Sequence, residues 1–447
     1  MQTKTALAHL RKILSFSIVI VVFMAACTSS SPGLTGPQKI NILAEKYVRL
    51  GLNIGQYDPV FIDAYFGPDS LKPTGNQLPA FPKDTLLTAV NQLIEECNQF
   101  RSATDNDTLL KRATWIIGQL KAFHRRIQIF AGDNPSFDDE SMDLFGTKAP
   151  TYPESHFQSL LASLDSMLPG KGPIPDRFQQ LANRFIIPKD KLDTVFKASI
   201  AECRKRTLAH YQLPKEEGFQ LEFVSDKPWN GYNWYKGHYN SLIQINTDLD
   251  IFIEKAIDVG SHESYPGHHV YNMLLEKNLY NDKGWVEISM YPLFSPQSLI
   301  AEGSANYGIE MVFPGYEKNV FAKNVLLPLA GLDTTGLDIY FNALSIKGAL
   351  NYIRNEVARG LLDGSMPENK AIDWLMNYGL YNRQTAEKGI SFIRLNRSYV
   401  INYNYGMDLV KKYIERKTGS AVDATARWEA FGWLLSNPVT VADLETK

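Results

Sequence analysis

The sequence predicts a mainly α-helical protein with a small β-sheet, and three observations lead to this fold class. First, most of the chain places apolar residues three and four positions apart, which puts them on one face of a helix. Second, two short segments between residues 218 and 250 alternate apolar and polar residues, as strands do. Third, nothing after the N-terminal region resembles an interdomain linker, so residues 39–447 are expected to form one large domain.

The N-terminal 26 residues are expected to be a signal peptide. Three basic residues precede an apolar run, residues 13–24, that is too short to span a bilayer. Small residues directly before Cys27 resemble a bacterial lipobox, which predicts acylation of Cys27; an ordinary signal peptide with an incidental cysteine is the alternative. Residues 27–38 would form a flexible tether. Because Thr28 rather than an aspartate follows the cysteine, we expect the lipid to anchor the protein to the periplasmic side of the outer membrane.

Composition limits the classes of function. The formal net charge is −2 and there is no basic block, which argues against nucleic-acid binding. Membrane contact would depend on the lipid, because no second apolar run is long enough to span a bilayer. Beyond Cys27 only Cys97 and Cys203 remain; they could pair, but they cannot form a cysteine-rich zinc site. Any metal must therefore be bound by histidines and carboxylates, and the oligomeric state is left open.

The elements follow from these patterns in chain order. Apolar stripes predict helices over residues 40–52, 85–100, 109–130 and 155–168, with a further helix that starts at Pro188 and includes 204–206. Alternation predicts strands over 219–224 and 241–246, and the aromatic segment between them, 229–239, would line a substrate cleft or close the core. Helices are expected again over 251–277, 296–313, 336–362, 369–378, 385–395 and 400–416.

Three of the eight histidines fall within residues 262–269, which read HESYPGHH. The short zinc signature H-E-x-x-H places two histidine ligands one helical turn apart, whereas here the later histidines stand six and seven positions after His262. Proline removes a helical amide and glycine allows unusual backbone angles, so we expect Pro266 and Gly267 to create a bulge. The bulge would return His268 to the face of His262, which makes these two residues the expected ligands.

The residue beside the first histidine fits this chemistry. A zinc hydrolase needs a carboxylate close to the bound water as general base, and Glu263 has that position. His269 is expected either to support the ligands or to replace one of them. The alternative is a histidine-rich turn held by hydrogen bonds alone, but a buried pair of His262 and Glu263 would be costly unless paired or bound to metal.

The third ligand is expected from a helix that begins at Ser295. Glu302 lies there among small residues that would allow a close approach of the helices, and a buried carboxylate is a suitable zinc ligand. Glu310, two turns later, is expected to be solvated or ion-paired. Asp258, one turn before His262, could orient that imidazole or be an ordinary surface carboxylate.

A tyrosine-rich segment, residues 394–406, is the last candidate. One of its phenols could donate to the oxyanion of a tetrahedral intermediate, and Arg397 could pair with a substrate carboxylate. Ordinary packing is the alternative for each of these side chains.

Residues 262–269 resemble the hallmark His-Glu-Gly-Tyr-Pro-Gly-His-His of the bacterial proteins grouped as domain of unknown function 885, with Ser264 in place of the glycine. Residues 301–307, and Tyr403 with Gly406, resemble two later elements, and earlier stretches extend the similarity over nearly the whole mature chain. The resemblance implies a zincin-like helical metallopeptidase fold, distantly similar to the helical carboxypeptidases and dipeptidyl carboxypeptidases.

The same resemblance implies roles for individual residues. Glu263 would be the general base and acid, and Tyr403 would be a donor in the transition state. Residues 241–246 would form the edge strand that pairs with an extended substrate, which makes Ile243 and Asn246 substrate-binding residues.

Together these observations predict a hydrolase that binds one zinc ion and acts outside the cytoplasm, specifically a metallopeptidase of carboxypeptidase or dipeptidase type. One alternative is a lipid-anchored binding protein whose zinc site is not catalytic, although the position of Glu263 argues against it. Another is a zinc hydrolase of a non-peptide amide or ester.

Overall fold

The computed structural model describes residues 34–445 except 76, 78, 228 and 420–422. The expected signal peptide (1–26), Cys27 and most of the expected tether (27–38) lie outside the described residues, so lipid anchoring stays a prediction. Residues Gly36–Lys447 form one unit through their internal contacts. Within the described part of the chain, no helix has the length and apolar character needed to cross a membrane.

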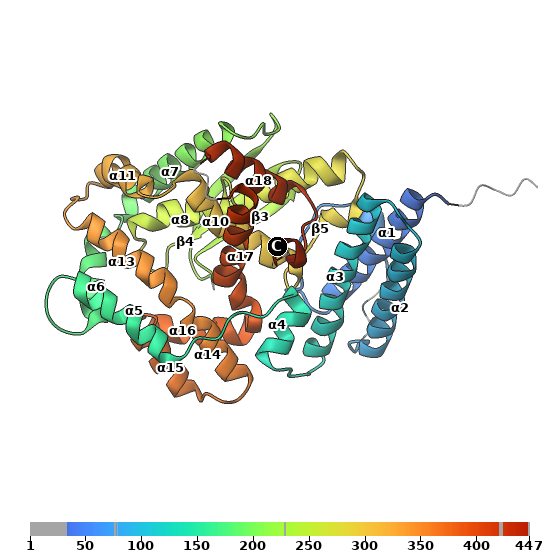
Figure 1. Ribbon diagram of the computed structural model, residues 1–447, viewed down its shortest axis with the longest axis horizontal. Helices are drawn as coiled ribbons and strands as arrows, with labels where there is room; N and C mark the ends of the chain where they lie inside the picture. The colour runs from blue at the N-terminus through green and yellow to red at the C-terminus, as the bar shows by residue number, and fades with distance from the viewer. Residues whose placement is uncertain (1–33, 76, 78, 228, 420–422, 446–447) are drawn as a thin grey trace, which may run out of the picture. The chain divides into compact units, whose positions relative to one another are not determined.

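The first three helices, α1 (Gly36–Gly55), α2 (Lys83–Ser102) and α3 (Asp107–Phe130), pack against one another and are seen in blue in Figure 1. Their apolar stripes meet around Tyr47, whose ring stacks on that of Phe123 at 5.0 Å. These three helices match the stripes in the sequence.

The other helices before the main sheet are α4 (Phe137–Phe145), α5 (Glu154–Met167), α6 (Ile174–Ala182) and α7 (Leu192–Leu208). After it come α8 (Ile253–Glu263), α9 (His268–Leu275), α10 (Pro296–Val312), α11 (Glu317–Phe321), α12 (Leu327–Ala330), α13 (Leu337–Leu350), α14 (Ile353–Leu362), α15 (Glu368–Asn377), α16 (Arg383–Asn396), α17 (Ile401–Thr418), α18 (Ala424–Ser436) and α19 (Val441–Glu445). The prediction of a mainly α-helical protein with a small sheet is confirmed.

Two small sheets complete the fold. β1 (Ile62–Tyr65) pairs antiparallel with β5 (Met290–Pro292), and neither strand was expected. In the three-stranded sheet, β4 (Asn240–Asn246) lies between β2 (Gly218–Val224), to which it is parallel, and β3 (Gly231–Gly237), to which it is antiparallel. The aromatic segment between the two expected strands is thus a strand itself.

The strand order corrects one prediction. Residues 241–246 were expected to form an edge strand, but β4 is central and its main chain bonds to a strand on each side. Ile243 is fully buried, and the side chain of Asn246 donates to the main-chain oxygens of Lys227 and Trp229. Neither residue can meet a substrate through a free edge of β4, whereas β3 is an edge of this sheet.

Helix α10 lies at the centre of the second half of the fold and is buried along most of its length. It packs against α17 and α8, and Figure 1 shows these three helices side by side in the middle of the view. Because α10 bears Glu302 and α8 ends in the first half of the histidine motif, this packing positions the candidate site.

Candidate metal centre

The histidine motif is divided between two helices. Helix α8 ends at Glu263, four residues follow, and α9 begins at His268, so the expected bulge within one helix is in fact a complete break. The chain folds back so tightly that a Cβ atom at Gly267 would lie 1.9 Å from the main-chain oxygen of His262. Only glycine fits there, and the Tyr265–Pro266 peptide bond before it is cis.

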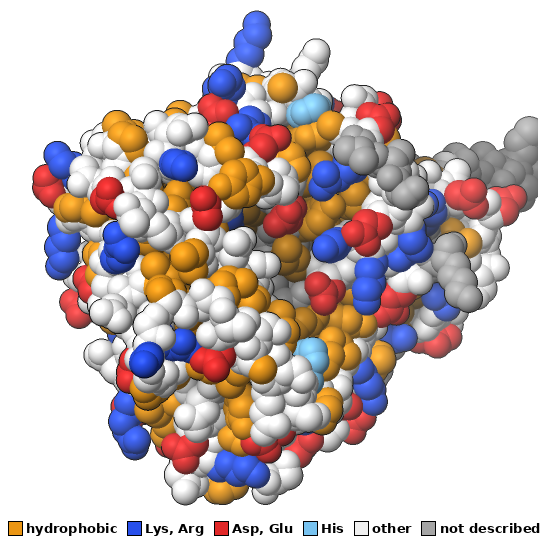
Figure 2. Space-filling view, turned by 60° about the vertical axis from the view of Figure 1, so that its left-hand side comes forward, with side chains coloured by type: hydrophobic (Ala, Val, Ile, Leu, Met, Phe, Trp, Pro, Cys, Tyr) orange, Lys and Arg blue, Asp and Glu red, His pale blue; other side chains and the backbone are white. Residues whose placement is uncertain are grey.

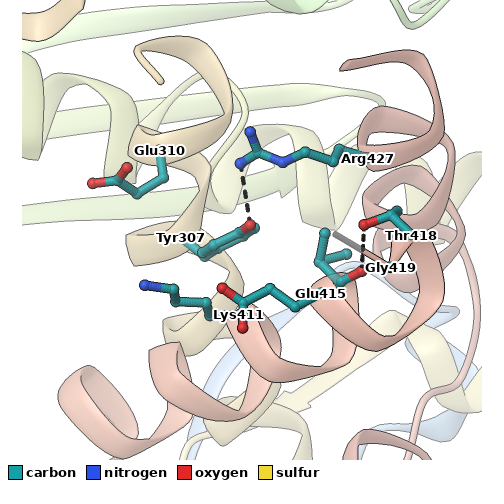
Figure 3. A pocket seen from close by; sticks show the side chains of 8 residues that line it. Tyr307, Glu310, Lys411, Glu415, Thr418, Gly419 and Arg427 are labelled. Atoms are coloured by element: carbon teal, nitrogen blue, oxygen red, sulfur yellow. Dashed lines mark hydrogen bonds between the residues drawn. The ribbon is translucent and has the colours of Figure 1, made fainter. Parts of the chain in front are cut away.

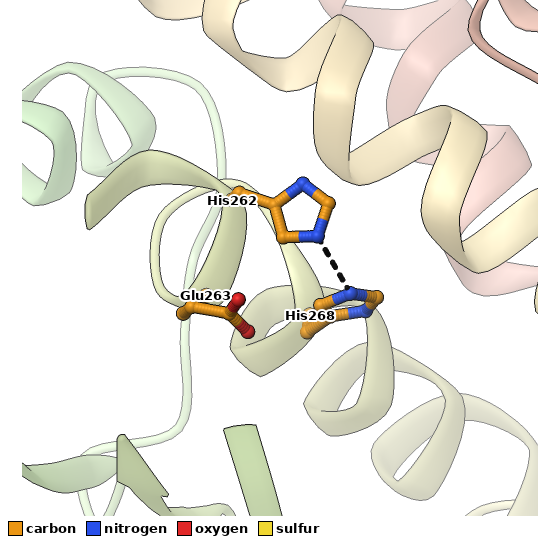
Figure 4. Close-up of side chains that lie close together, drawn as sticks. All are labelled: His262, Glu263 and His268. Carbon is orange, nitrogen blue, oxygen red and sulfur yellow. Dashed lines mark hydrogen bonds between the residues drawn. The ribbon is translucent and has the colours of Figure 1, made fainter. Parts of the chain in front are cut away.

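The break brings two imidazoles together (Figure 4). The Nε2 atoms of His262 and His268 are 3.1 Å apart. Oε2 of Glu302 lies 3.2 Å from Nε2 of His262 and 3.7 Å from Nε2 of His268. Ligand atoms on a tetrahedral zinc ion, at about 2.0–2.1 Å from the metal, are separated by about 3.3 Å. The three atoms therefore have the spacing of a three-residue zinc site with an open fourth position.

Glu302 is held by a buried tyrosine. Its Oε1 accepts a hydrogen bond of 2.8 Å from the phenol of Tyr399, which leaves Oε2 turned toward the imidazoles. Oε2 is buried, and no described residue donates a hydrogen bond to it. Burial alone would raise the pKa of this carboxyl, but the charge of His268 and the nearby imidazole of His262 lower it well below its usual range.

Asn306 orients the first imidazole. Its Nδ2 donates to the main-chain oxygen of Tyr403 at 2.8 Å, so its Oδ1 is free to accept from Nδ1 of His262 at 3.0 Å. The prediction that Asp258 would orient His262 is wrong, because the carboxylate of Asp258 pairs with Lys318 at 3.1 Å. Asn306 lies one turn after Glu302 on the same helix face, a spacing that could have revealed it.

The donor set fits a cation. With the Nδ1 proton of His262 directed to Asn306, its Nε2 presents a lone pair toward Oε2 of Glu302, and two such acceptors repel unless positive charge lies between them. A proton meets this need when no metal is bound: burial disfavours the charged imidazole, yet Glu302 and Glu263 raise the pKa of His262 to about 9. A divalent ion would take the place of that proton.

Glu263 lies beside the ligand atoms without being tied to them. One of its carboxylate oxygens lies within 4.8 Å of the histidine nitrogens, and Figure 4 shows it facing the same space. The side chain is 6% exposed and makes no hydrogen bond or ion pair with any described residue. Burial raises its pKa. It packs against Gly231 on β3, where a Cβ atom would stand 3.1 Å from its Oε1.

His269 points away from this cluster. The structure places its Nδ1 2.8 Å from the hydroxyl of Ser241 and its Nε2 3.1 Å from Oε2 of Glu217. Because this imidazole is fully buried and both nitrogens are engaged, it is neither a ligand nor a partner of the ligands here. Burial would raise the pKa of Glu217, but His269 and Tyr265 lower it to about 2. His269 instead fastens α9 to β4.

Two residues near the cluster were not predicted as site residues, although Tyr232 belongs to the aromatic segment 229–239 that was expected to line a cleft or close the core. Asp63 on β1 accepts a hydrogen bond from the phenol of Tyr232 on β3. Burial raises the pKa of Asp63 to about 6, and the charges of Glu302 and Glu263 contribute to the rise. Both residues come from strands whose positions only tertiary packing determines, and no local spacing in the sequence marks them.

The tyrosine-rich segment contributes two residues to the site, Tyr399 and Tyr403, and one, Arg397, to the framework. Burial and the charge of Glu302 raise the pKa of Tyr403 well above its usual value, so its phenol is a neutral donor near the cluster. Arg397 was expected to meet a substrate carboxylate, but its guanidinium donates to Glu140 at 2.6 Å and to Asn134 at 3.0 Å. Its role is therefore structural.

Two cavities lie apart from the cluster. One, of about 630 Å³, is bordered by α10, α17 and α18 and is lined by residues that include Tyr307, Lys411 and Arg427 (Figure 3). The other, of about 930 Å³, is bordered by residues that include Tyr211 and Trp428. Neither is lined by a residue of the histidine cluster. Figure 2 also shows a hollow on one face of the molecule, with hydrophobic side chains within it and charged ones at its rim.

Comparisons with known proteins leave the family open. No protein-family model matches this chain, and no curated protein matches it. A solved structure described as a proposed lipoprotein from Colwellia psychrerythraea superimposes with a TM-score of 0.49 at 14% identity, over 81% of this chain and 68% of that one. A proposed lipoprotein of unknown function from Shewanella oneidensis gives a TM-score of 0.47 at 12% identity, over 81% and 72%. These similarities assign neither a family nor an activity.

Proposed function

We propose that this protein is a metal-dependent hydrolase that binds one zinc ion and acts on peptides, as a zincin-like metallopeptidase. One observation gives the proposal its main support. The Nε2 atoms of His262 and His268 and Oε2 of Glu302 lie within 3.1–3.7 Å of one another, and the buried carboxylate of Glu263 lies beside them without a hydrogen bond to any of the three. A zinc ion in this position would polarise a carbonyl group and lower the pKa of water.

Glu263 would be the catalytic residue that moves protons. Its carboxylate is buried and has no competing hydrogen-bond donor among the described residues. It can therefore accept a proton from an attacking water and return that proton to the leaving amine. Tyr403, as a neutral phenol, would donate to the oxyanion that forms during attack. Asn306 and Tyr399 would keep the ligands in place.

The location is part of the proposal and rests on the sequence. We place the protein outside the cytoplasm, attached by a lipid on Cys27 to the periplasmic side of the outer membrane. A peptidase there would meet peptides in the periplasm, and the zinc site contains no cysteine that an oxidising compartment could inactivate.

Metal analysis combined with hydrolysis of a peptide pool tests the proposal. We expect one zinc per chain in both the wild-type protein and Glu263→Gln. The substitution should lower the rate of peptide hydrolysis at least about 10²-fold. Glu302→Gln should lose most of the zinc, whereas the control Glu310→Gln, on the exposed face of the same helix, should change neither quantity.

Two results would count against this function. Full hydrolysis by Glu263→Gln would remove the catalytic assignment. Stoichiometric zinc without hydrolysis of any peptide by the wild-type protein would favour a non-catalytic site in a binding protein, or a hydrolase of non-peptide amides or esters.

A further inference from the structure

Arg354, on the first turn of α14, is a partly buried cation without a carboxylate partner. Its guanidinium carbon stands 5.2 Å from the ring centre of Phe392 and 5.8 Å from that of Tyr403. Through this group it forms neither a hydrogen bond nor an ion pair with any residue that the structure describes. Five N–H donors thus remain for a ligand.

Two arginines on neighbouring segments behave differently. Arg359, on the same helix, pairs with Glu356 at 2.7 Å and with Asp138 at 3.3 Å. Arg397 pairs with Glu140 at 2.6 Å. Removing a guanidinium from water is costly unless carboxylates or other acceptors replace the water, so the partly buried Arg354 would gain from a ligand that supplies such acceptors.

Tyr403 connects Arg354 to the metal centre. Its main-chain oxygen accepts from Asn306, which also holds the imidazole of one expected ligand. Its ring centre lies 5.7 Å from that of Tyr399, which in turn donates to Glu302. Arg354 therefore lies one aromatic ring away from the residues that surround the cluster.

The carboxylates at the site bear on how a negatively charged substrate could be bound by Arg354. Three carboxylates, Asp63, Glu263 and Glu302, influence one another around the cluster. A divalent ion at the cluster would offset much of this charge, so a substrate carboxylate is held apart from the metal only if a separate positive group receives it. The planar guanidinium is suited to this task, because it can donate two parallel hydrogen bonds to one carboxylate.

We propose that the guanidinium of Arg354 binds the C-terminal carboxylate of a peptide, and that the protein therefore acts on the free C-terminal ends of peptides. The proposal rests on the proposed function, because it assigns the substrate class of the same site. Each extended residue spans about 3.5 Å, so an arginine one ring away from the residues that surround the cluster selects a bond close to the C-terminus.

Binding is tested on the zinc-loaded full-length Glu263→Gln protein, in which hydrolysis is blocked and the expected ligands are intact. The probe is a randomised tetrapeptide library prepared in two forms, with a free C-terminal carboxylate and with a carboxamide. Bound peptides are quantified by mass spectrometry after ultrafiltration. We expect the free-acid form to bind at least about 30-fold more tightly, as is typical when a hydrogen-bonded charge pair is present rather than missing one partner.

Variants of Arg354 in the same background identify the group responsible. Arg354→Gln should abolish the preference and leave the affinity for carboxamides unchanged, whereas Arg354→Lys should keep part of the preference because the charge remains. Arg383→Gln is the matched control: it removes the same charge from an exposed position on α16 that pairs with Glu387, and it should leave the preference intact.

Three results would overturn the proposal: binding without preference by the parent protein, equal weakening of both peptide forms by Arg354→Gln, or a preference that survives this substitution. The proposed function fails in a distinguishable way. If the wild-type protein hydrolyses no peptide while an Arg354-dependent preference for free acids persists, the hydrolase assignment is wrong and the carboxylate-binding site stands.

Discussion

The main chains of Gly303 and Gly406 are in contact where α10 crosses α17. A Cβ atom on Gly303 would lie 2.4 Å from the carbonyl oxygen of Gly406, and a Cβ atom on Gly406 would lie 2.8 Å from the carbonyl oxygen of Leu299. This close approach brings the phenol of Tyr399 and the main chain of Tyr403 within reach of α10. The small residues around the third expected ligand therefore serve the contact with α17.

Gly303→Ala is expected to destabilise the protein by about 2–3 kcal/mol, because the atoms that an added Cβ would meet all belong to the backbone of Gly406, which cannot yield locally. Gly348→Ala is the control: this glycine lies in the exposed part of α13 with nothing within 4 Å of an added Cβ, so alanine should stabilise by about 0.5–1 kcal/mol. Urea unfolding measures both. Equal changes in the free energy of unfolding for the two variants would contradict the close contact between Gly303 and Gly406.

Asn306→Ala should weaken zinc binding about 10–100-fold, because the imidazole of His262 loses the acceptor that fixes its orientation. Asp258→Asn, which changes the carboxylate first expected to have this role, should leave zinc affinity unchanged. Competition with a chelator of known affinity provides the measurement. A larger loss from Asp258→Asn than from Asn306→Ala would reverse the assignment.

Substitutions of the neighbouring Tyr399 and Tyr403 should affect metal binding and turnover differently. Tyr403→Phe is expected to keep the zinc content and to lower kcat about 10²-fold, because only the donor to the oxyanion is lost. Tyr399→Phe removes the hydrogen bond to Glu302 and should lower zinc affinity. Zinc content and kcat are measured for both variants, and a fall in zinc content for Tyr403→Phe would assign this phenol a structural role.

Glu217 gives the fold an acid-sensitive contact. Its pKa is about 2 in the folded protein and about 4.5 in an unfolded chain, so its stabilisation is complete above pH 4.5 and is lost as the pH falls toward 2. The contribution is at most about 3 kcal/mol. Unfolding free energies between pH 5 and 2.5 should decline less steeply in Glu217→Gln than in the wild type. Identical slopes for the two proteins would show that this carboxyl does not titrate as described.

Local patterns in the sequence identify most of what is local in the structure. Apolar spacing locates the long helices to within a few residues, because burial of one face needs only that spacing. It does not reveal where a long stripe is broken, and residues 251–277 and 336–362 each contain two helices. The ligand chemistry of His262, His268 and Glu302 is likewise visible in the residue types alone.

What the sequence could not reveal depends on contacts between distant segments. Asp258 lies one turn before His262 on the same helix, but the partner of that imidazole, Asn306, comes from α10. Strand β3 was missed because its aromatic residues obscure the alternation. The edge position of residues 241–246 was implied by the family resemblance, and the pairing of β4 with a strand on each side corrects it. Arg397 has a carboxylate partner from another element, whereas Arg354 contacts two aromatic rings, and the sequence around each residue does not reveal this difference.

The wide sequence separation of the groups around the cluster links metal binding to the order of folding. His262 and His268 are close along the chain, but the residues that fix them and Glu302 include Tyr399, nearly a hundred positions after the third expected ligand. Contacts of such long range form late in folding, because closing a long loop has a high entropic cost. Tight zinc binding would therefore report that the C-terminal part of the chain has docked, and a nascent chain that ends with α16, before Tyr399 and α17, would bind the ion weakly.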